Sequence, residues 1–156
     1  MPVDVVNQPS IRVASIRHLG PYPTIGEAFE RLGKVAGASG LFGPGALMIA
    51  VYHDDPRVTP EGQLRSDASL TLRDGAQVPD GLAEQVVPGG RYARMTYKGP
   101  YTGLQAAWKE LMSEWLPNSG EGLAEGAAYE LYRNDPSNTP PEQLVTEIYV
   151  PLTVSA

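Results

Sequence analysis

The sequence contains no cysteine and only two histidines, His18 and His53. Without cysteine the chain has no disulfide bond, no thiolate nucleophile and no cysteine-ligated zinc. The two histidines fall at the ends of different predicted strands and show no paired ligand spacing. We therefore expect no metal site and no cofactor.

Long hydrophobic stretches are also missing. No apolar run approaches the roughly 20 residues that a membrane-spanning helix requires. The first residues, Met1-Pro2-Val3-Asp4, lack the basic and apolar regions of a signal peptide. We therefore expect a cytoplasmic protein that does not associate with membranes.

Positive charge is scarce, with 12 Lys and Arg residues against 18 Asp and Glu residues and a net charge of −6. This balance disfavours polyanionic partners and is compatible with cationic ligands. The basic residues Arg91, Arg94, Lys98 and Lys109 are scattered, so we expect no direct nucleic-acid binding. The sequence also lacks the G-x-S-x-G motif that positions a serine nucleophile.

The phrase Gly-Pro-Tyr occurs at residues 20–22 and again at 99–101, and it marks an internal repeat. With an offset of 79 or 80 residues, apolar positions and turn residues match across most of both halves. Two half-length copies indicate a duplicated unit that packs against its twin to complete its core. We expect a single domain over residues 1–156, with repeats at about 11–72 and 90–152 and a linker at 73–89.

Each copy reads as strand, helix, strand, strand, because polar and apolar residues alternate in the strands and apolar residues follow helical spacing between them. The predicted strands cover residues 11–19, 46–53, 64–72, 91–98, 127–133 and 144–152. The predicted helices begin near Thr24 and Thr102, and Pro117 is expected to stop the second one. Residues 1–10 are expected to be an extended, partly loose lead-in. The pattern predicts an α+β fold in which two helices cover one face of an antiparallel sheet.

Strand alternation then assigns side chains to the uncovered face of the sheet. We predict that this face carries two carboxylates and three tyrosines, namely Tyr92, Glu130, Tyr132, Glu147 and Tyr149. Tyr129 and Leu131 would lie under the helices, and Trp108 would lie near the site but chiefly in the core. Ring faces beside a shielded carboxylate suit a flat aromatic cation. A solvated strand face has the same composition, so a structural interpretation of Glu147, whose counterpart in the first copy is Asp67, stays open.

Three phrases, taken together and in order, resemble the GyrI-like family. They are the Gly-Pro-Tyr phrase before each helix, Tyr129-Glu130-Leu131-Tyr132 before an Asn-Asp-Pro turn, and the closing Thr146-Glu147-Ile148-Tyr149-Val150-Pro151-Leu152. That family comprises gyrase-inhibitor proteins and the effector-binding domains of AraC-type and MerR-type multidrug regulators. The resemblance covers residues 11–152. It implies two tandem units and, between the halves, a cleft for bulky, lipophilic, often cationic compounds.

The resemblance also implies roles for individual residues. Glu147 matches the pocket acid of the family, and Tyr149 and Tyr132 match its aromatic pocket wall. Some stand-alone members are hydrolases that open cyclopropane-bearing genotoxins, so the question of enzyme activity stays open, with Glu147 as the catalytic residue in that case. We favour sequestration of a small-molecule ligand, then hydrolysis, then inhibition of DNA gyrase, for which the sequence reveals no partner surface. No helix-turn-helix segment is present in the sequence, so we do not expect direct transcriptional control.

Overall fold

The computed structural model describes residues 2–154, which form two compact units. The first unit contains residues 9–89, and the second unit contains residues 2–8 together with 90–154. The first unit holds the first predicted copy and the predicted linker, and the second unit holds the second predicted copy and the N-terminal segment. Among the described residues, no helix is both long and apolar enough to cross a lipid bilayer.

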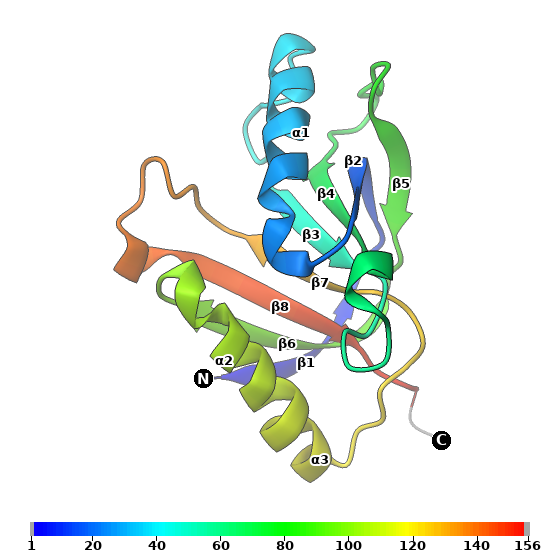
Figure 1. Ribbon diagram of the computed structural model, residues 1–156, viewed down its shortest axis with the longest axis vertical. Helices are drawn as coiled ribbons and strands as arrows, with labels where there is room; N and C mark the ends of the chain where they lie inside the picture. Colours follow the sequence, from blue (N-terminus) through cyan, green and yellow to red (C-terminus); the bar gives the residue numbers. More distant parts are fainter. Residues whose placement is uncertain (1, 155–156) are drawn as a thin grey trace. The chain divides into compact units, whose positions relative to one another are not determined.

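The first unit combines four antiparallel strands with one helix (Figure 1). Its strands are β2 (Ile11–Leu19), β3 (Met48–Tyr52), β4 (Arg65–Thr71) and β5 (Ala83–Val87), in the order β3-β4-β2-β5. Helix α1 (Gly26–Ala38) packs on β2 and β4. It buries Ala28, Leu32 and Ala36, whose spacing of four residues places them on one face of the helix.

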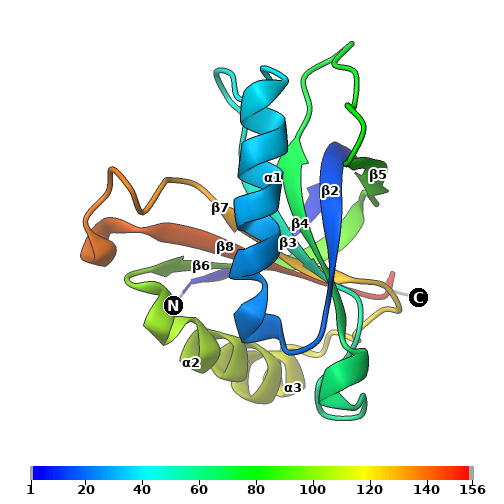
Figure 2. The same cartoon turned by 45° about the horizontal axis from the view of Figure 1, so that its top comes forward.

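The second unit repeats this arrangement (Figure 2). Its strands are β1 (Val3–Gln8), β6 (Gly90–Lys98), β7 (Ala128–Tyr132) and β8 (Val145–Pro151), in the order β1-β6-β8-β7. Its helix begins as α2 (Leu104–Lys109), continues as a π-helical segment (Glu110–Trp115) and ends as α3 (Leu116–Ser119). The strands are antiparallel and a helix covers one face of them, so the fold is α+β, as the sequence predicts.

The second helix does not stop at Pro117, contrary to the prediction. A proline inside an α-helix lacks the N–H for the bond to residue i−4 and crowds that residue's carbonyl. The π-helical segment that precedes Pro117 uses i→i+5 bonds, which relieves this conflict and lets the helix continue to Ser119. Gly120, with a φ of 78°, then ends the helix in the left-handed conformation that glycine adopts without strain.

Two segments that were expected to have little structure are edge strands. The lead-in forms β1, which pairs with β6, and the linker contains β5, which pairs with β2. Val3 and Ala83, the first residues of these strands, are 80 positions apart, so the two strands are themselves part of the repeat. Each one precedes its own copy in sequence and completes the sheet of the other unit. Prolines and glycines flank these short strands and are typical of turns, so the sequence did not predict strands there.

The core of the second unit lies between its helix and strands β6 and β8. Its buried members are Ala93, Met95, Ala107, Leu111, Ile148, Val150 and Leu152. This set confirms the predicted inward faces of β6 and β8. Because strand side chains alternate, a slip of one residue would turn every one of these apolar strand residues outward, so the register is strongly specified.

Candidate ligand-binding site

The six predicted site residues all belong to the second unit. Trp108 lies on α2, and the other five occupy two opposite faces of the strands. Glu147 and Tyr149 of β8, and Tyr92 of β6, lie on the face away from the helix, as predicted. Glu130 and Tyr132 do not join them. The cross-strand partners of these two residues are Ile148 and Thr146, which place both side chains on the helix side.

The predicted register of β7 was therefore wrong, and its physical cause is clear. The prediction turned Tyr129 and Leu131 inward because they are the more apolar residues of the strand. Both faces of β7 are buried, since Tyr129 is 1% exposed and Glu130 is 4% exposed. Alternation identifies the core face only where one face is solvated, so it could not distinguish the two faces of this strand.

On the helix side, Glu130 is surrounded by aromatic side chains. Trp108 Nε1 of α2 donates a hydrogen bond to Glu130 Oε2 at 2.5 Å, and Tyr132 Oη donates to Glu130 Oε1 at 2.7 Å. The ring of Tyr101, at the start of the helix, lies 5.5 Å from that of Tyr132. We call these four residues the Glu130 cluster. Hydrogen bonds to a charged acceptor are about twice as strong as neutral ones, so they fix both rings against the carboxylate.

The Glu130 cluster adjoins the hydrophobic core of the second unit, against which Trp108 also packs. An indole N–H lies in the plane of its ring, so Trp108 presents its edge, and not a ring face, to Glu130. Trp108 and Tyr132 are half-buried, and Tyr101 is exposed. Although 37% of Tyr101 is exposed, its partial burial, together with the negative charges of Asp135 and Glu130, raises the pKa of its phenol, which stays neutral near pH 7.

Tyr97 and Gly103 hold the Gly-Pro-Tyr phrase next to this cluster. Tyr97 Oη donates a hydrogen bond to the carbonyl oxygen of Pro100 at 2.7 Å. A Cβ at Gly103 would overlap the Tyr97 hydroxyl, so only glycine fits there while that bond is made. The repeated phrase is therefore a structural device that positions Tyr101.

On the face away from the helix, three buried tyrosines pack together. The rings of Tyr129 and Tyr149 are stacked with centroids 4.6 Å apart, and Tyr92 meets them edge-on at 5.5 Å and 6.1 Å. Burial raises the pKa of all three phenols, and hydrogen-bond donation to Glu147 adds to the effect for Tyr149. These tyrosines thus form a neutral aromatic layer beside Glu147.

Glu147 itself is held by an arginine that the sequence interpretation missed. Its Oε1 accepts hydrogen bonds from Tyr149 Oη at 2.8 Å and from Arg133 Nε at 3.0 Å, and Arg133 Nη2 lies 2.9 Å away. This bond raises the pKa of Arg133, whose side chain is 46% exposed. The charge of Glu147 is therefore already compensated, and a ligand cation would have to displace the guanidinium.

The first unit contains the same pairing at the same place. Asp67, the counterpart of Glu147, is 1% exposed and lies 2.6 Å from both Arg17 Nε and His53 Nε2. Burial alone would raise the pKa of Asp67, but the hydrogen bonds from His53 and Arg17 outweigh it and lower the pKa. His53 and Asp67 stand 80 positions before Arg133 and Glu147. The repeat offset was therefore a sequence signal that Arg133 could pair with Glu147.

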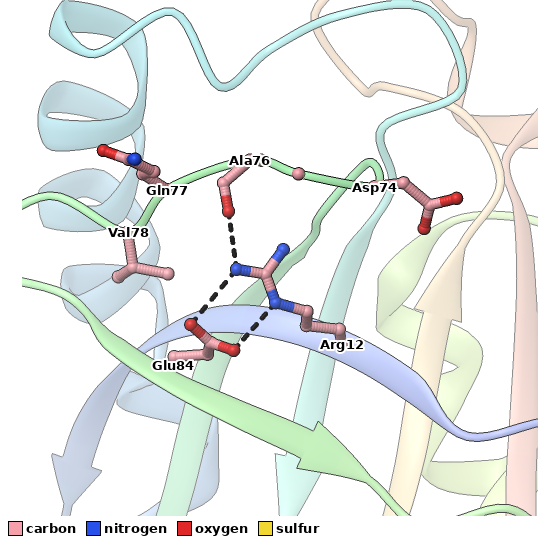
Figure 3. A pocket seen from close by; sticks show the side chains of 7 residues that line it. Arg12, Asp74, Ala76, Gln77, Val78 and Glu84 are labelled. Atoms are coloured by element: carbon pink, nitrogen blue, oxygen red, sulfur yellow. Dashed lines mark hydrogen bonds and ion pairs between the residues drawn. The ribbon is translucent and has the colours of Figure 1, made fainter.

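Two cavities lie elsewhere in the described part of the chain, and none of the six predicted site residues lines them. One, of about 620 Å³, lies in the first unit between β2, β5 and the loop at residues 74–78 (Figure 3). There the Arg12 guanidinium donates to both carboxylate oxygens of Glu84, at 2.8 Å and 3.1 Å, and to the Ala76 carbonyl. Through these hydrogen bonds Arg12 holds the loop at residues 74–78 next to β2 and β5, and we call this contact the latch.

Comparison with known proteins gives a family and a fold. Residues 1–153 match the family model described as GyrI-like small molecule binding domain. A DNA gyrase inhibitor from Yersinia enterocolitica is 34% identical over 140 residues, which cover 86% of this chain and 88% of that protein. The C-terminal domain of EcmrR matches with a TM-score of 0.79 at 22% identity over 97% of both chains. SAV2435, solved with tetraphenylphosphonium, matches with a TM-score of 0.72 at 15% identity over 98% of this chain and 94% of its own.

Proposed function

Since this chain belongs to the GyrI-like family of small-molecule-binding domains, we propose that it binds bulky lipophilic cations and that the Glu130 cluster recognises their charge. The observation that carries the proposal is a buried carboxylate whose two oxygens accept hydrogen bonds from the edges of Trp108 and Tyr132. The cluster thus combines a negative charge with three aromatic side chains in one place.

The energies involved are large enough for recognition. A cation over an indole or phenol face gains about 0.5–2 kcal/mol, and tryptophan is the best of these platforms. A cation about 5 Å from the Glu130 carboxylate would gain a further ~3 kcal/mol at an effective dielectric constant of about 20. A neutral ligand of the same shape would gain neither contribution, so the cluster should discriminate by charge.

Two observations favour Glu130 over Glu147, the acid that the family resemblance implied. Arg133 already compensates the charge of Glu147. In addition, the first unit has an acid paired with a base at the Glu147 position, whereas Ala50 and Phe29 stand at the positions of Glu130 and Trp108. The fold therefore forms without a carboxylate and an indole there, which suggests that they serve binding. The expected cleft between the halves stays a prediction.

Tetraphenylphosphonium, the ligand named for SAV2435, is the natural probe. Tetraphenylborate has the same shape and the opposite charge, so it serves as the matched control ligand. Calorimetric titration should give tighter binding of the phosphonium than of the borate. Glu130→Gln should weaken phosphonium binding by about 10- to 100-fold, because a hydrogen bond or contact with a charged group contributes roughly 1.5–3 kcal/mol. Glu147→Gln should change it by less than about threefold, since the charge it removes is already paired.

Equal affinities for the two probes, or equal losses in the two variants, would contradict the proposal. Trp108→Phe provides a second test, because it keeps an aromatic ring while it removes the N–H donor to Glu130 and replaces the indole with a smaller ring. It should weaken phosphonium binding less than Glu130→Gln does. Incubation of the same variants with a cyclopropane-bearing compound, followed by mass spectrometry, tests the hydrolase alternative, in which turnover would require a carboxylate as general base.

A second candidate function rests on the gyrase-inhibitor name of the Yersinia relative, which is 34% identical to this chain. If this protein also inhibits DNA gyrase, it should reduce supercoiling of relaxed plasmid by the purified enzyme. Glu130→Gln should leave that inhibition unchanged, because a buried side chain does not contribute to a protein-binding surface. Unaltered supercoiling at a large excess of this protein would reject the candidate.

A further inference from the structure

The second unit contains a cavity of about 350 Å³ beside its π-helical segment. This volume falls within the range of about 300–1,000 Å³ that is typical of small-molecule pockets. Residues of β1, β6 and the helix line the cavity, among them Val3, Met95, Glu110, Glu114, Trp115 and Asn118. We propose that this cavity, the π-helix groove, is a second ligand site that binds a small organic ammonium ion bearing an aromatic or apolar arm.

The chemistry of the groove is that of an amphiphilic cation site. Val3 and Met95 supply apolar contacts, and the ring of Trp115 packs against the same core and offers an aromatic face. Glu110 and Glu114 bring two carboxylates, whereas none of the lining residues within the described range 2–154 is basic. An ammonium group near the carboxylates and an apolar arm against the ring and the methionine would satisfy both parts of the groove.

The π-helical geometry brings these groups to one wall. In a regular α-helix each residue turns by about 100°, so side chains five positions apart point about 140° away from each other. The i→i+5 bonds of a π-helix bring such residues back towards the same side. Glu110 and Trp115 are five positions apart and bound this segment, with Glu114 next to Trp115. All three side chains accordingly line the same groove.

The first unit shows that the fold does not require this arrangement. With an offset of 79, the positions of Glu110, Glu114 and Trp115 are taken by Arg31, Val35 and Ala36. Those residues belong to α1, which is α-helical over its whole length, and Ala36 is fully buried. The π segment, the two acids and the indole therefore occur in one copy only. π-Helical turns are found frequently at functional sites, which agrees with a binding role.

The two tryptophans of the chain allow the groove to be observed separately from the Glu130 cluster. In a Trp108→Phe background, Trp115 is the only indole and reports on the groove. Benzyltrimethylammonium, a small aromatic cation, should change the Trp115 fluorescence in a saturable way. Glu110→Gln combined with Glu114→Gln should weaken this binding by about tenfold, because it removes both charges that attract the ammonium. Glu142→Gln, at an exposed glutamate of the same unit, should change it by less than about twofold.

Neopentylbenzene, the neutral isostere of the probe, should bind more weakly than benzyltrimethylammonium, and equal binding would overturn the proposal. So would an equal effect of the Glu142 variant, or the absence of a saturable response. If the double variant melts at a lower temperature, Glu114→Gln alone gives the same test at an exposed side chain. It should weaken binding by about threefold, which is half of the tenfold effect on the free-energy scale. Glu130→Gln should not alter the Trp115 response, so failure at the groove leaves the Glu130 proposal standing, and the reverse also holds.

Discussion

Asp67→Asn should destabilise the protein by about 2 kcal/mol. Asp67 is 1% exposed and accepts charge-assisted hydrogen bonds from Arg17 and His53, each contributing roughly 1.5–3 kcal/mol. The loss should be smaller than the sum of the two bonds. The side chains of Arg17 and His53 are 42% and 24% exposed, so they regain water, and asparagine still accepts one bond.

Thermal unfolding measures this effect directly. For a chain of this size, 2 kcal/mol corresponds to a fall in Tm of about 4–8 °C. Asp55→Asn is the matched control, because Asp55 forms a similar ion pair with Arg57 but the two side chains are 39% and 69% exposed. That variant should lose less than about 0.5 kcal/mol. Equal losses in the two variants would refute the reasoning that burial gives the Asp67 pair its strength.

The pH dependence of stability provides an independent check. The pKa of Asp67 is lower in the folded state than its unperturbed value of 3.8. A group of this kind stabilises the folded state fully above its unfolded pKa, and the contribution is lost as the pH falls through the folded pKa. The stability of the unchanged protein should therefore decline more steeply below about pH 4 than that of Asp67→Asn. If the stabilities of the two proteins fall equally steeply with decreasing pH, Asp67 does not titrate in this way.

Gly103→Ala and Arg12→Gln test structural roles assigned above, and Gly33→Ala is a control for the first of them. Gly103→Ala should lower stability by about 1–3 kcal/mol, because its Cβ would displace the Tyr97 hydroxyl from Pro100. Gly33→Ala in α1, where nothing lies within 4 Å of the added Cβ, should instead raise stability by about 0.5–1 kcal/mol, and thermal melts of the two variants test the pair. Arg12→Gln should increase amide hydrogen exchange in residues 74–84, since it removes the donors to Glu84 and Ala76. Unchanged exchange there would argue against the latch.

The sequence predicted the fold well where one face of an element is apolar and the other is polar. Strand β2 begins and ends at the predicted residues, and the inward faces of β6 and β8 are confirmed by the core of the second unit. The same rule failed for β7, where Tyr129 and Glu130 are both buried on opposite faces. Periodicity carries no information about a strand that is covered on both sides.

Contacts between distant residues limited the prediction of the site. Glu147 meets Arg133 because β7 and β8 are neighbours and Leu131 stands opposite Glu147. The pairing of Trp108 with Glu130 likewise depends on how the helix packs on β7. Neither contact follows from spacing within one element, so both required the strand register. The cavity beside the π-helical segment could not be predicted either, since no residue pattern indicated a change from α- to π-helix.

The duplication separates the residues that the fold requires in both copies from those that only one copy contains. Where both copies keep the same interaction, the fold is its common cause. The pairs Asp67–His53 and Glu147–Arg133 are of this kind. Where only one copy has a costly feature, such as the buried Glu130, the fold cannot be the reason, because the other copy forms with alanine in its place. This difference between the copies supports the ligand-binding role that we propose for Glu130.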